Sequence, residues 1–253
     1  MTRGAPRPSR RLARVKRLEG RHVVVTGAGT GIGRAIAQRL ADEGARLTLL
    51  ARAEERLRDV VPGATTRSVD IRDRAAVTAA FDEPLDALVA NAGIGGPNAP
   101  GDGDRWDEIV ETNLFGTYWC ARAAEPRLID GGRIVVTSSI LARIGVSGYT
   151  AYCASKAGLL GLVRSLAAEL APRRIQLNAI CPGWVNTDMA WQGLDAFDGL
   201  TREQAFEVAM GEVPLRRMSE PAEIAGTVAW LLSDDALGVT GQAIDHNNGA
   251  FMI

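Results

Sequence analysis

The sequence predicts an α/β protein built as one doubly wound, parallel sheet of seven strands. Short apolar runs, rich in β-branched residues, alternate with longer amphipathic stretches, which is typical of parallel strands covered by helices on both faces. No long polar linker separates these units. With 253 residues, 46% of them hydrophobic and 23% charged, the chain is long enough to bury a large core in a single domain.

The expected elements follow from the spacing of apolar residues. The predicted strands are 21–27, 46–51, 65–70, 85–91, 132–139, 175–181 and 241–245. The predicted helices are 32–43, 53–60, 72–81, 105–124, 152–171 and 220–233. Because right-handed crossovers join parallel strands, this alternation places a ligand at the carboxyl ends of the strands.

The first 18 residues differ in composition from the rest. They contain seven Lys or Arg and no acidic residue, and they lack an apolar run. We expect 1–18 to be a basic, disordered tail and 19–253 to be the catalytic domain. Binding of the tail to nucleic acid or to a membrane is the alternative, but neither partner is expected. Because no export signal or membrane span is recognisable, we expect a cytoplasmic protein with reduced cysteines.

The segment "VVVTGAGTGIGR" (23–34) has the setting of a phosphate-binding turn, between a β-branched strand and a helix. Glycines let the backbone approach a pyrophosphate closely, and a helix N-terminus favours its negative charge. The spacing is not G-x-G-x-x-G. Gly27, Gly31 and Gly33 instead form G-x-x-x-G-x-G, which leaves Gly29 as the glycine that this pattern does not demand.

Several motifs resemble those of the short-chain dehydrogenase/reductase family, which implies a Rossmann fold and covers about residues 20–249. In chain order they are "TGAGTGIG" (26–33), "NAG" (91–93), "ETNLFG" (111–116), "TSS" (137–139), "YCASK" (152–156), "PGWVNT" (182–187) and "VTGQAID" (239–245). The sequence departs from the family's "VDGG"-like ending, because it has "DHNNG" at 245–249. This departure makes the contacts near the C-terminus harder to predict.

Four residues are expected to carry the chemistry. Tyr152 and Lys156 stand at i and i+4 of a helix, so an ammonium lies on the same face as a phenol and can lower its pKa. The resemblance implies that Tyr152 is the acid/base and that Lys156 also binds the ribose. It further implies that Ser139 binds the substrate oxygen and that Asn113 holds a water for proton relay. We expect no metal, since no carboxylate or histidine cluster is present.

The end of the second strand indicates which nicotinamide cofactor is used. An acidic residue there binds the ribose 2′-hydroxyl and repels a 2′-phosphate, but this chain has Ala51 followed by Arg52. NADP(H) is therefore favoured, and NAD(H) stays open. The resemblance implies a cofactor site made of Gly27, Thr30, Gly31, Ile32, Gly33, Arg52, Asp70, Ile71, Asn91, Ala92, Gly93, Tyr152, Lys156, Pro182, Gly183, Val185 and Thr187.

The resemblance places substrate specificity at about 184–215, where several large apolar side chains could form a lid. Packing of these side chains within their own helices is the alternative. The expected substrate contacts are Ser139, Leu141, Tyr152, Trp184, Met189 and Trp191.

The expected function is interconversion of a ketone and a secondary alcohol by hydride transfer, with NADPH-dependent reduction of a 3-oxoacyl-like or similar ketone favoured. An NAD-dependent secondary-alcohol dehydrogenase and a non-catalytic dinucleotide-binding regulator are the alternatives. A cofactor-free lyase on the same scaffold is disfavoured because the glycine loop is kept. The family implies a homotetramer, or a homodimer, formed through the long helices 105–124 and 152–171.

Overall fold

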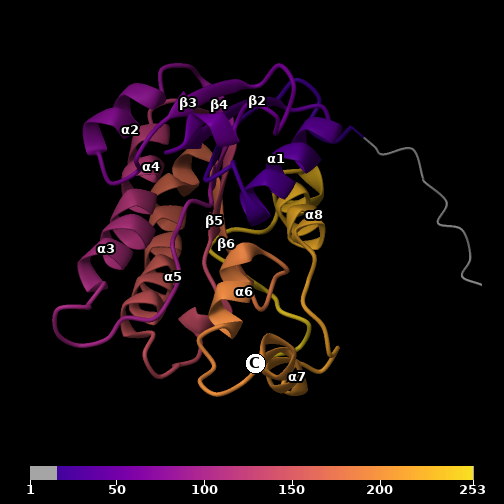
Figure 1. Ribbon diagram of the computed structural model, residues 1–253. Helices are drawn as coiled ribbons and strands as arrows, with labels where there is room; N and C mark the ends of the chain where they lie inside the picture. Colours follow the sequence, from indigo (N-terminus) through magenta and orange to yellow (C-terminus); the bar gives the residue numbers. More distant parts are fainter. Residues whose placement is uncertain (1–15, 253) are drawn as a thin grey trace, which may run out of the picture.

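The computed structural model describes residues 16–252 and contains one sheet between layers of helices (Figure 1). The sheet is parallel, with the strand order β3-β2-β1-β4-β5-β6-β7. The predicted fold class is therefore confirmed. The strands are β1 (His22–Thr26), β2 (Arg46–Ala51), β3 (Thr65–Ser68), β4 (Leu85–Ala90), β5 (Leu128–Thr137), β6 (Gln176–Pro182) and β7 (Ala243–His246). After β3 the chain crosses back past β1 to form β4 on its other side, so the parallel sheet extends in both directions from β1. A ligand in such a sheet binds where β1 and β4 end.

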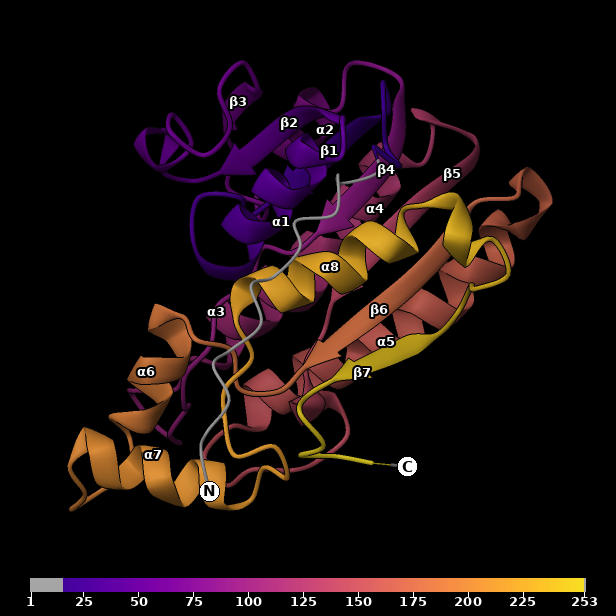
Figure 2. The same cartoon turned by 90° about the vertical axis from the view of Figure 1, so that its right-hand side faces the viewer.

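Helices cover both faces of the sheet, as Figure 2 shows from the side of α1 and α8. The helices are α1 (Gly31–Asp42), α2 (Arg74–Ala80), α3 (Trp106–Val110), α4 (Gly116–Ala124), α5 (Thr150–Leu170), α6 (Asp188–Leu194), α7 (Arg202–Gly211) and α8 (Pro221–Leu231). Within the part of the chain that the structure describes, none of them is long and apolar enough to cross a bilayer.

Alternation along the strands builds the two cores. Val24 and Leu88 point to the layer of α2, α4 and α5, whereas Val23 and Val89 point to the layer of α1 and α8. Because both faces are covered, the central strands are apolar at almost every position and are buried. The sheet is thus a rigid platform for the loops at its carboxyl edge.

Two expected helices differ in the structure, and two further helices were not expected. The prediction of a helix over 53–60 is wrong, because only a 3₁₀ turn at Glu54–Arg56 forms before the chain turns at Pro62. A segment this short gains too few hydrogen bonds to offset helix nucleation. The expected helix 105–124 exists, but a π-helical turn at Glu111–Phe115 separates α3 from α4. The helices α6 and α7 lie within the expected lid and were not predicted.

The predicted boundary between tail and domain at residue 18 is also corrected. Leu18 is completely buried, and the guanidinium of Arg17 pairs with the buried carboxylate of Glu43 at 2.7 Å. The folded part therefore includes Lys16–Leu18. The remainder of the expected tail, residues 1–15, lies outside the described residues.

Candidate functional site

The predicted glycines of the first loop each have a steric reason. A Cβ on Gly33 would lie 2.1 Å from the carbonyl oxygen of Gly27, and a Cβ on Gly27 would lie 2.7 Å from Cα of Ala92. Gly27 and Gly31 also have positive φ, +67° and +52°, which side chains disfavour. Gly29 has no positive φ, and its hydrogens face the side chain of Arg56. The loop therefore follows the spacing that the sequence predicted.

The N-terminus of α1 fits a dinucleotide pyrophosphate. The N-cap residue, Thr30, makes no side-chain hydrogen bond to the helix, and the first turn contains no acidic residue. The backbone N–H groups of this turn and the positive end of the helix dipole are thus available to an anion. Thr30, Ile32 and Gly33 of the predicted cofactor set belong to this turn. Across the loop, Thr187 lies against Gly31, because a Cβ there would be 3.3 Å from its methyl group.

Hydrogen bonds of Asn91 and Thr26 join three strand ends beneath the loop. The hydroxyl of Thr26 accepts from the backbone N–H groups of Asn91 and Ala92, both at 3.0 Å. The Asn91 amide donates to the carbonyl of Gly27 at 3.3 Å and accepts from the hydroxyl of Thr137 at 3.2 Å. Asn91 is therefore a link between β1, β4 and β5. Sequence reasoning missed Thr26 and Thr137 as parts of the site, although polar residues ending apolar strands were the available signal.

Lys156 is buried, with a 4% exposed side chain, and it donates from Nζ to the carbonyl of Thr137 at 2.9 Å. Its Nζ lies 5.6 Å from the centre of the Tyr152 ring, as the i, i+4 spacing predicted. Burial lowers the pKa of Lys156 to about 8. Burial also raises the pKa of Tyr152, and a hydrogen bond from Ser139 only partly offsets this effect. In this structure the phenol therefore favours its protonated form, contrary to the expected lowering by the ammonium.

Ser139 stands two residues beyond β5, where it caps the 3₁₀ turn Ile140–Ala142. Its hydroxyl accepts from the backbone N–H of Leu141 at 3.1 Å and shares a side-chain hydrogen bond with Tyr152. The hydroxyls of Ser139 and Tyr152 thus converge at one point at the carboxyl edge of the sheet. Two neighbouring hydroxyl donors can hold and protonate a single oxygen atom.

Asn113 lies in the π-helical turn and is fully buried. Its side chain accepts from the N–H of Ile94 at 2.8 Å and donates to the carbonyl of Ile94 at 2.9 Å and to the hydroxyl of Ser155 at 3.2 Å. The side chain therefore holds the segment after Gly93 against α5. A π turn inside a helix often marks a functional site. That Asn113 holds a water stays a prediction.

The edge of the site at the end of β2 carries unpaired positive charge. Arg52 is exposed, and none of the described carboxylates pairs with it. Asp70 is paired with Arg72 at 2.6 Å, which lowers the pKa of that carboxyl. Ile71 packs against Gly116, where a Cβ would lie 2.6 Å from its Cδ1. The expected contacts of Asp70 and Ile71 with the adenine side of a cofactor stay predictions.

Beyond β6 the predicted residues lead into the lid. Gly183 donates its N–H to the carbonyl of His246 at 3.2 Å, and a Cβ on it would lie 2.9 Å from Asn247. Pro182 is the last residue of β6, Val185 is buried, and Thr187 caps α6. Of these three residues, Thr187 contacts the glycine loop at Gly31.

The large apolar side chains of the lid divide into two groups. Trp191 stacks on Phe206 at 5.9 Å and donates from Nε1 to Asn186 at 2.8 Å, and Trp184 packs on Gly193. These contacts are internal to the region 184–215, but Trp191 packs on a residue of α7, whereas the packing alternative expected contacts within its own helix. Met189 instead reaches the loop after β4, since a Cβ on Gly95 would lie 3.0 Å from its sulfur. The half-buried Leu141 lies two residues after Ser139 and donates its backbone N–H to the Ser139 hydroxyl; contact of its side chain with a substrate stays a prediction.

Sequence reasoning also missed Asn98, which is buried and binds the first turn of α5 from outside. Its side-chain oxygen accepts from the N–H of Ala151, the residue before Tyr152, at 3.0 Å and from the hydroxyl of Thr150 at 3.2 Å. The residue at the N-cap itself, Tyr149, makes no side-chain cap. Asn98 thus replaces a local cap and orients the start of the helix that carries Tyr152.

We expect Asn98→Ala to lower kcat about 10-fold, because the first turn of α5 would fray, and to cost about 1 kcal/mol of stability. The matched control is Asp73→Ala, which removes the N-cap of α2 and its hydrogen bonds to Ala75 and Ala76. This control should lower the melting temperature similarly and leave kcat unchanged. Equal kcat losses in both variants would show that the effect of Asn98 is merely one of stability.

Comparison with known proteins identifies close relatives over almost the whole chain. A family model described as "Enoyl-(Acyl carrier protein) reductase" matches residues 27–250. The chain is 37% identical to the 3-oxoacyl-(acyl-carrier-protein) reductase FabG of Staphylococcus aureus over 247 residues, covering 90% of this chain and 97% of the relative. It is also 37% identical to a putative ketoacyl reductase of the monensin polyketide synthase from Streptomyces virginiae, covering 90% and 96%.

Solved structures agree with these relatives. Levodione reductase superposes with a TM-score of 0.86 at 32% identity, covering 92% of this chain and 98% of that protein. An actinorhodin polyketide ketoreductase solved with NADPH has a TM-score of 0.85 at 35% identity, covering 91% and 97%.

Proposed function

The chain belongs to the short-chain dehydrogenase/reductase family, and on that premise we propose that it is an NADPH-dependent reductase of 3-oxoacyl-type ketones. Membership makes it an oxidoreductase that acts on a CH–OH or C=O group. The observation that carries the proposal is the convergence of the Ser139 and Tyr152 hydroxyls beside the buried amine of Lys156. The glycine loop, at the neighbouring strand end, supports a dinucleotide partner.

In the proposed reaction a nicotinamide cofactor, held by the glycine loop and Lys156, would supply the hydride for the carbonyl carbon of the substrate. Ser139 donates a hydrogen bond to the carbonyl oxygen, which stabilises the charge that develops there. Tyr152 donates its phenolic proton to the same oxygen as the alcohol forms. Because burial raises the pKa of Tyr152, the phenol is protonated near neutral pH and suits reduction rather than oxidation. Lys156, held by the Thr137 carbonyl, places positive charge beside the phenolate that remains.

The residues at the end of β2 support NADP(H) over NAD(H). Ala51 leaves no carboxylate to bind a 2′-hydroxyl, and the exposed Arg52 forms no direct ion pair with the described carboxylates, although its charge helps to lower the pKa of Asp70. An arginine that is free of ion pairs can bind a phosphate with two parallel hydrogen bonds. The relative solved with NADPH is consistent with this choice.

We expect wild-type protein to use NADPH at least 10-fold more efficiently than NADH, and Ala51→Asp to shift this ratio toward NADH by about 100-fold. The measurement is kcat/KM with each cofactor. The control, Ala79→Asp, adds the same charge on the exposed face of α2 and should leave the ratio unchanged. A wild-type preference for NADH would contradict the assignment and favour an NAD-dependent alcohol dehydrogenase.

For the substrate we propose a 3-oxoacyl thioester or a similar, largely apolar ketone. The two relatives at 37% identity are named as 3-oxoacyl and ketoacyl reductases, and Met189 brings an apolar side chain from the lid to the loop beside the site. The test is NADPH oxidation with 3-oxoacyl thioesters of increasing chain length, compared with simple cyclic ketones. Faster turnover of the thioesters supports the proposal, whereas turnover of cyclic ketones alone would contradict it.

We further propose, from the family, a cytoplasmic homotetramer or homodimer that pairs through α4 and α5. Trp106 and Phe115 support this assembly, because they are 42% and 48% exposed at the start of α3 and immediately before α4.

A further inference from the structure

Two chain segments connect the lid to the rest of the molecule and lie side by side. From here on the lid means its helical part, residues 188–214, and the residues that flank this part, 184–187 and 215–219, are the hinge segments. Val185 and Ser219 form a parallel bridge in which the N–H of Ser219 donates to the carbonyl of Trp184 at 2.9 Å. The N–H of Asn186 donates to the carbonyl of Ser219, also at 2.9 Å. Because these hydrogen bonds join the two hinge segments, a movement of the lid relative to the sheet has to move both segments together.

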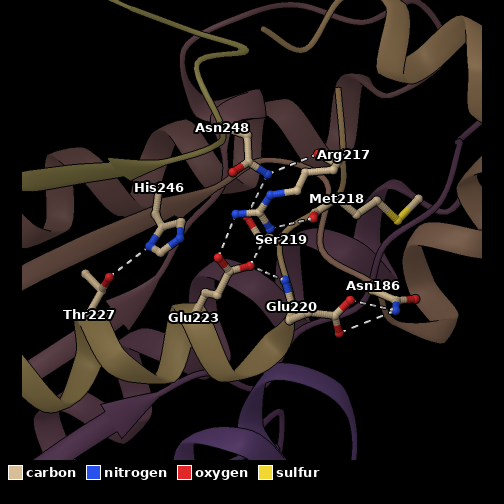
Figure 3. A network of polar contacts seen from close by, with 9 residues as sticks. All are labelled: Asn186, Arg217, Met218, Ser219, Glu220, Glu223, Thr227, His246 and Asn248. Carbon is tan, nitrogen blue, oxygen red and sulfur yellow. Dashed lines mark hydrogen bonds and ion pairs between the residues drawn. The ribbon is translucent and has the colours of Figure 1, made fainter. Parts of the chain in front are cut away.

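Asn248 holds the second hinge segment from the C-terminal side (Figure 3). Its side-chain amide donates to the carbonyl of Arg217 and to the hydroxyl of Ser219, both at 3.0 Å. Its backbone carbonyl accepts from the N–H of Leu215 at 3.2 Å. Ser219 is completely buried, so the hydrogen bond that it accepts is partly shielded from competing water, whereas the one to the Arg217 carbonyl is exposed. One residue thus binds three positions of the hinge.

The same region has unusual backbone conformations. Among the described residues, the only non-glycine residues with positive φ are Arg174, Arg216 and Asn248. Arg216, with φ of +54°, lies in the second hinge segment, and Asn248, with φ of +56°, is the residue that binds this segment. Asparagine tolerates this conformation, but arginine adopts it at a cost. Arg216 of the second hinge segment is therefore held in a conformation that arginine disfavours.

Other contacts anchor the hinge to α8 rather than to the C-terminus. Arg217 pairs with Glu223 at 2.6 and 2.7 Å, and Asn186 donates to Glu220 at 3.1 Å (Figure 3). Asn248 is the side chain that ties the hinge to the segment after β7. This segment is the "DHNNG" stretch in which the sequence departs from the family's usual ending.

We propose that Asn248 is a positioning residue that holds the lid hinge closed and so limits the rate of cofactor exchange. The connection runs from Asn248 through Ser219 and Val185 to Thr187, which lies against Gly31 of the glycine loop. The link to cofactor exchange rests on the proposed function. The link between Asn248 and hinge opening does not, because it concerns hydrogen bonds within the chain.

Asn248→Gly tests the hinge directly, because glycine keeps the positive φ and removes only the two side-chain hydrogen bonds. Hydrogen exchange of the hinge amides, Asn186, Leu215 and Ser219, should become about 10-fold faster, as expected for the loss of one or two neutral hydrogen bonds. The control is Arg174→Gly, which removes another side chain at positive φ, at the end of the 3₁₀ turn after α5. Unchanged exchange of the hinge amides in Asn248→Gly would overturn the proposal.

Kinetics separate positioning from simple loss of stability. In Asn248→Gly, dissociation of NADP⁺ should be about 10-fold faster, while hydride transfer in a single turnover is unchanged. Ser219→Ala removes one of the acceptors, so adding Asn248→Gly to it should have a smaller effect than in wild type. If hydrogen exchange of the hinge amides became faster but NADP⁺ dissociation did not change, the proposed role of Asn248 in cofactor release would be overturned. Failure of the wild type to bind any nicotinamide cofactor would instead overturn the proposed function.

Discussion

Replacing Tyr152 by phenylalanine is expected to lower kcat for ketone reduction by about 1000-fold while leaving cofactor affinity within a few-fold of wild type. The substitution removes only the phenolic oxygen, which shares a hydrogen bond with Ser139 and is the proposed proton donor. A general acid placed at the reacting oxygen typically contributes two to four orders of magnitude. The fold should be unaffected, because the ring keeps its place on α5. Steady-state kinetics and equilibrium binding of NADPH measure the two quantities separately.

The matched control is Tyr149→Phe, which removes a phenolic hydroxyl three residues earlier, at the start of α5. Its kcat should remain close to that of wild type. If Tyr152→Phe retained more than a tenth of the wild-type kcat, Tyr152 would not be the proton donor, and the geometry around Ser139 would need another explanation.

Replacing Gly33 by alanine is expected to weaken cofactor binding by at least 100-fold and to destabilise the fold. A Cβ at this position would lie 2.1 Å from the carbonyl oxygen of Gly27 and 2.5 Å from the amide nitrogen of Asn91. Neither atom can yield without opening the connection between β1 and β4. Overpacking of this kind costs about 1–3 kcal/mol, and the displaced loop would no longer present its N–H groups to a pyrophosphate. Calorimetric binding of NADPH and the melting temperature are the measurements.

Gly29→Ala is the comparison within the same loop. Gly29 lacks a positive φ, and the nearest atom to a Cβ there belongs to the side chain of Arg56, at 3.0 Å. The Gly29→Ala variant should bind NADPH with an affinity within about 10-fold of that of wild type. Equal losses at both positions would mean that the loop depends on general flexibility and not on the spacing of Gly27, Gly31 and Gly33.

Much of the fold could be predicted because the relevant signals are local. Apolar runs such as 46–51 gave a strand with the same bounds, and the glycine spacing predicted the tight loop before α1. The segment 53–60 misled because its apolar residues, Leu57 and Val60, are buried without forming a helix. The lid helices were missed because their apolar side chains pack on one another and not on the sheet.

In the candidate site, too, local pairs of residues could be predicted and long-range contacts could not. Tyr152 and Lys156 could be paired from sequence, since i, i+4 spacing on a helix fixes their separation. Asn98 could not be connected to α5, because its partners lie more than 50 residues away in the chain. The direction in which the pKa of Tyr152 shifts could not be predicted from sequence either, because it depends on how deeply the packed helix buries the phenol.

The measurement that tests the central claim most directly is transfer of deuterium from NADPH labelled at the nicotinamide C4 to a 3-oxoacyl thioester. The account predicts that wild-type protein yields a 3-hydroxyacyl product with one deuterium on the carbinol carbon, and that Tyr152→Phe yields almost none. Binding of labelled NADPH without any transfer, across thioesters and simple ketones, would contradict the account and leave a dinucleotide-binding protein that does no reduction.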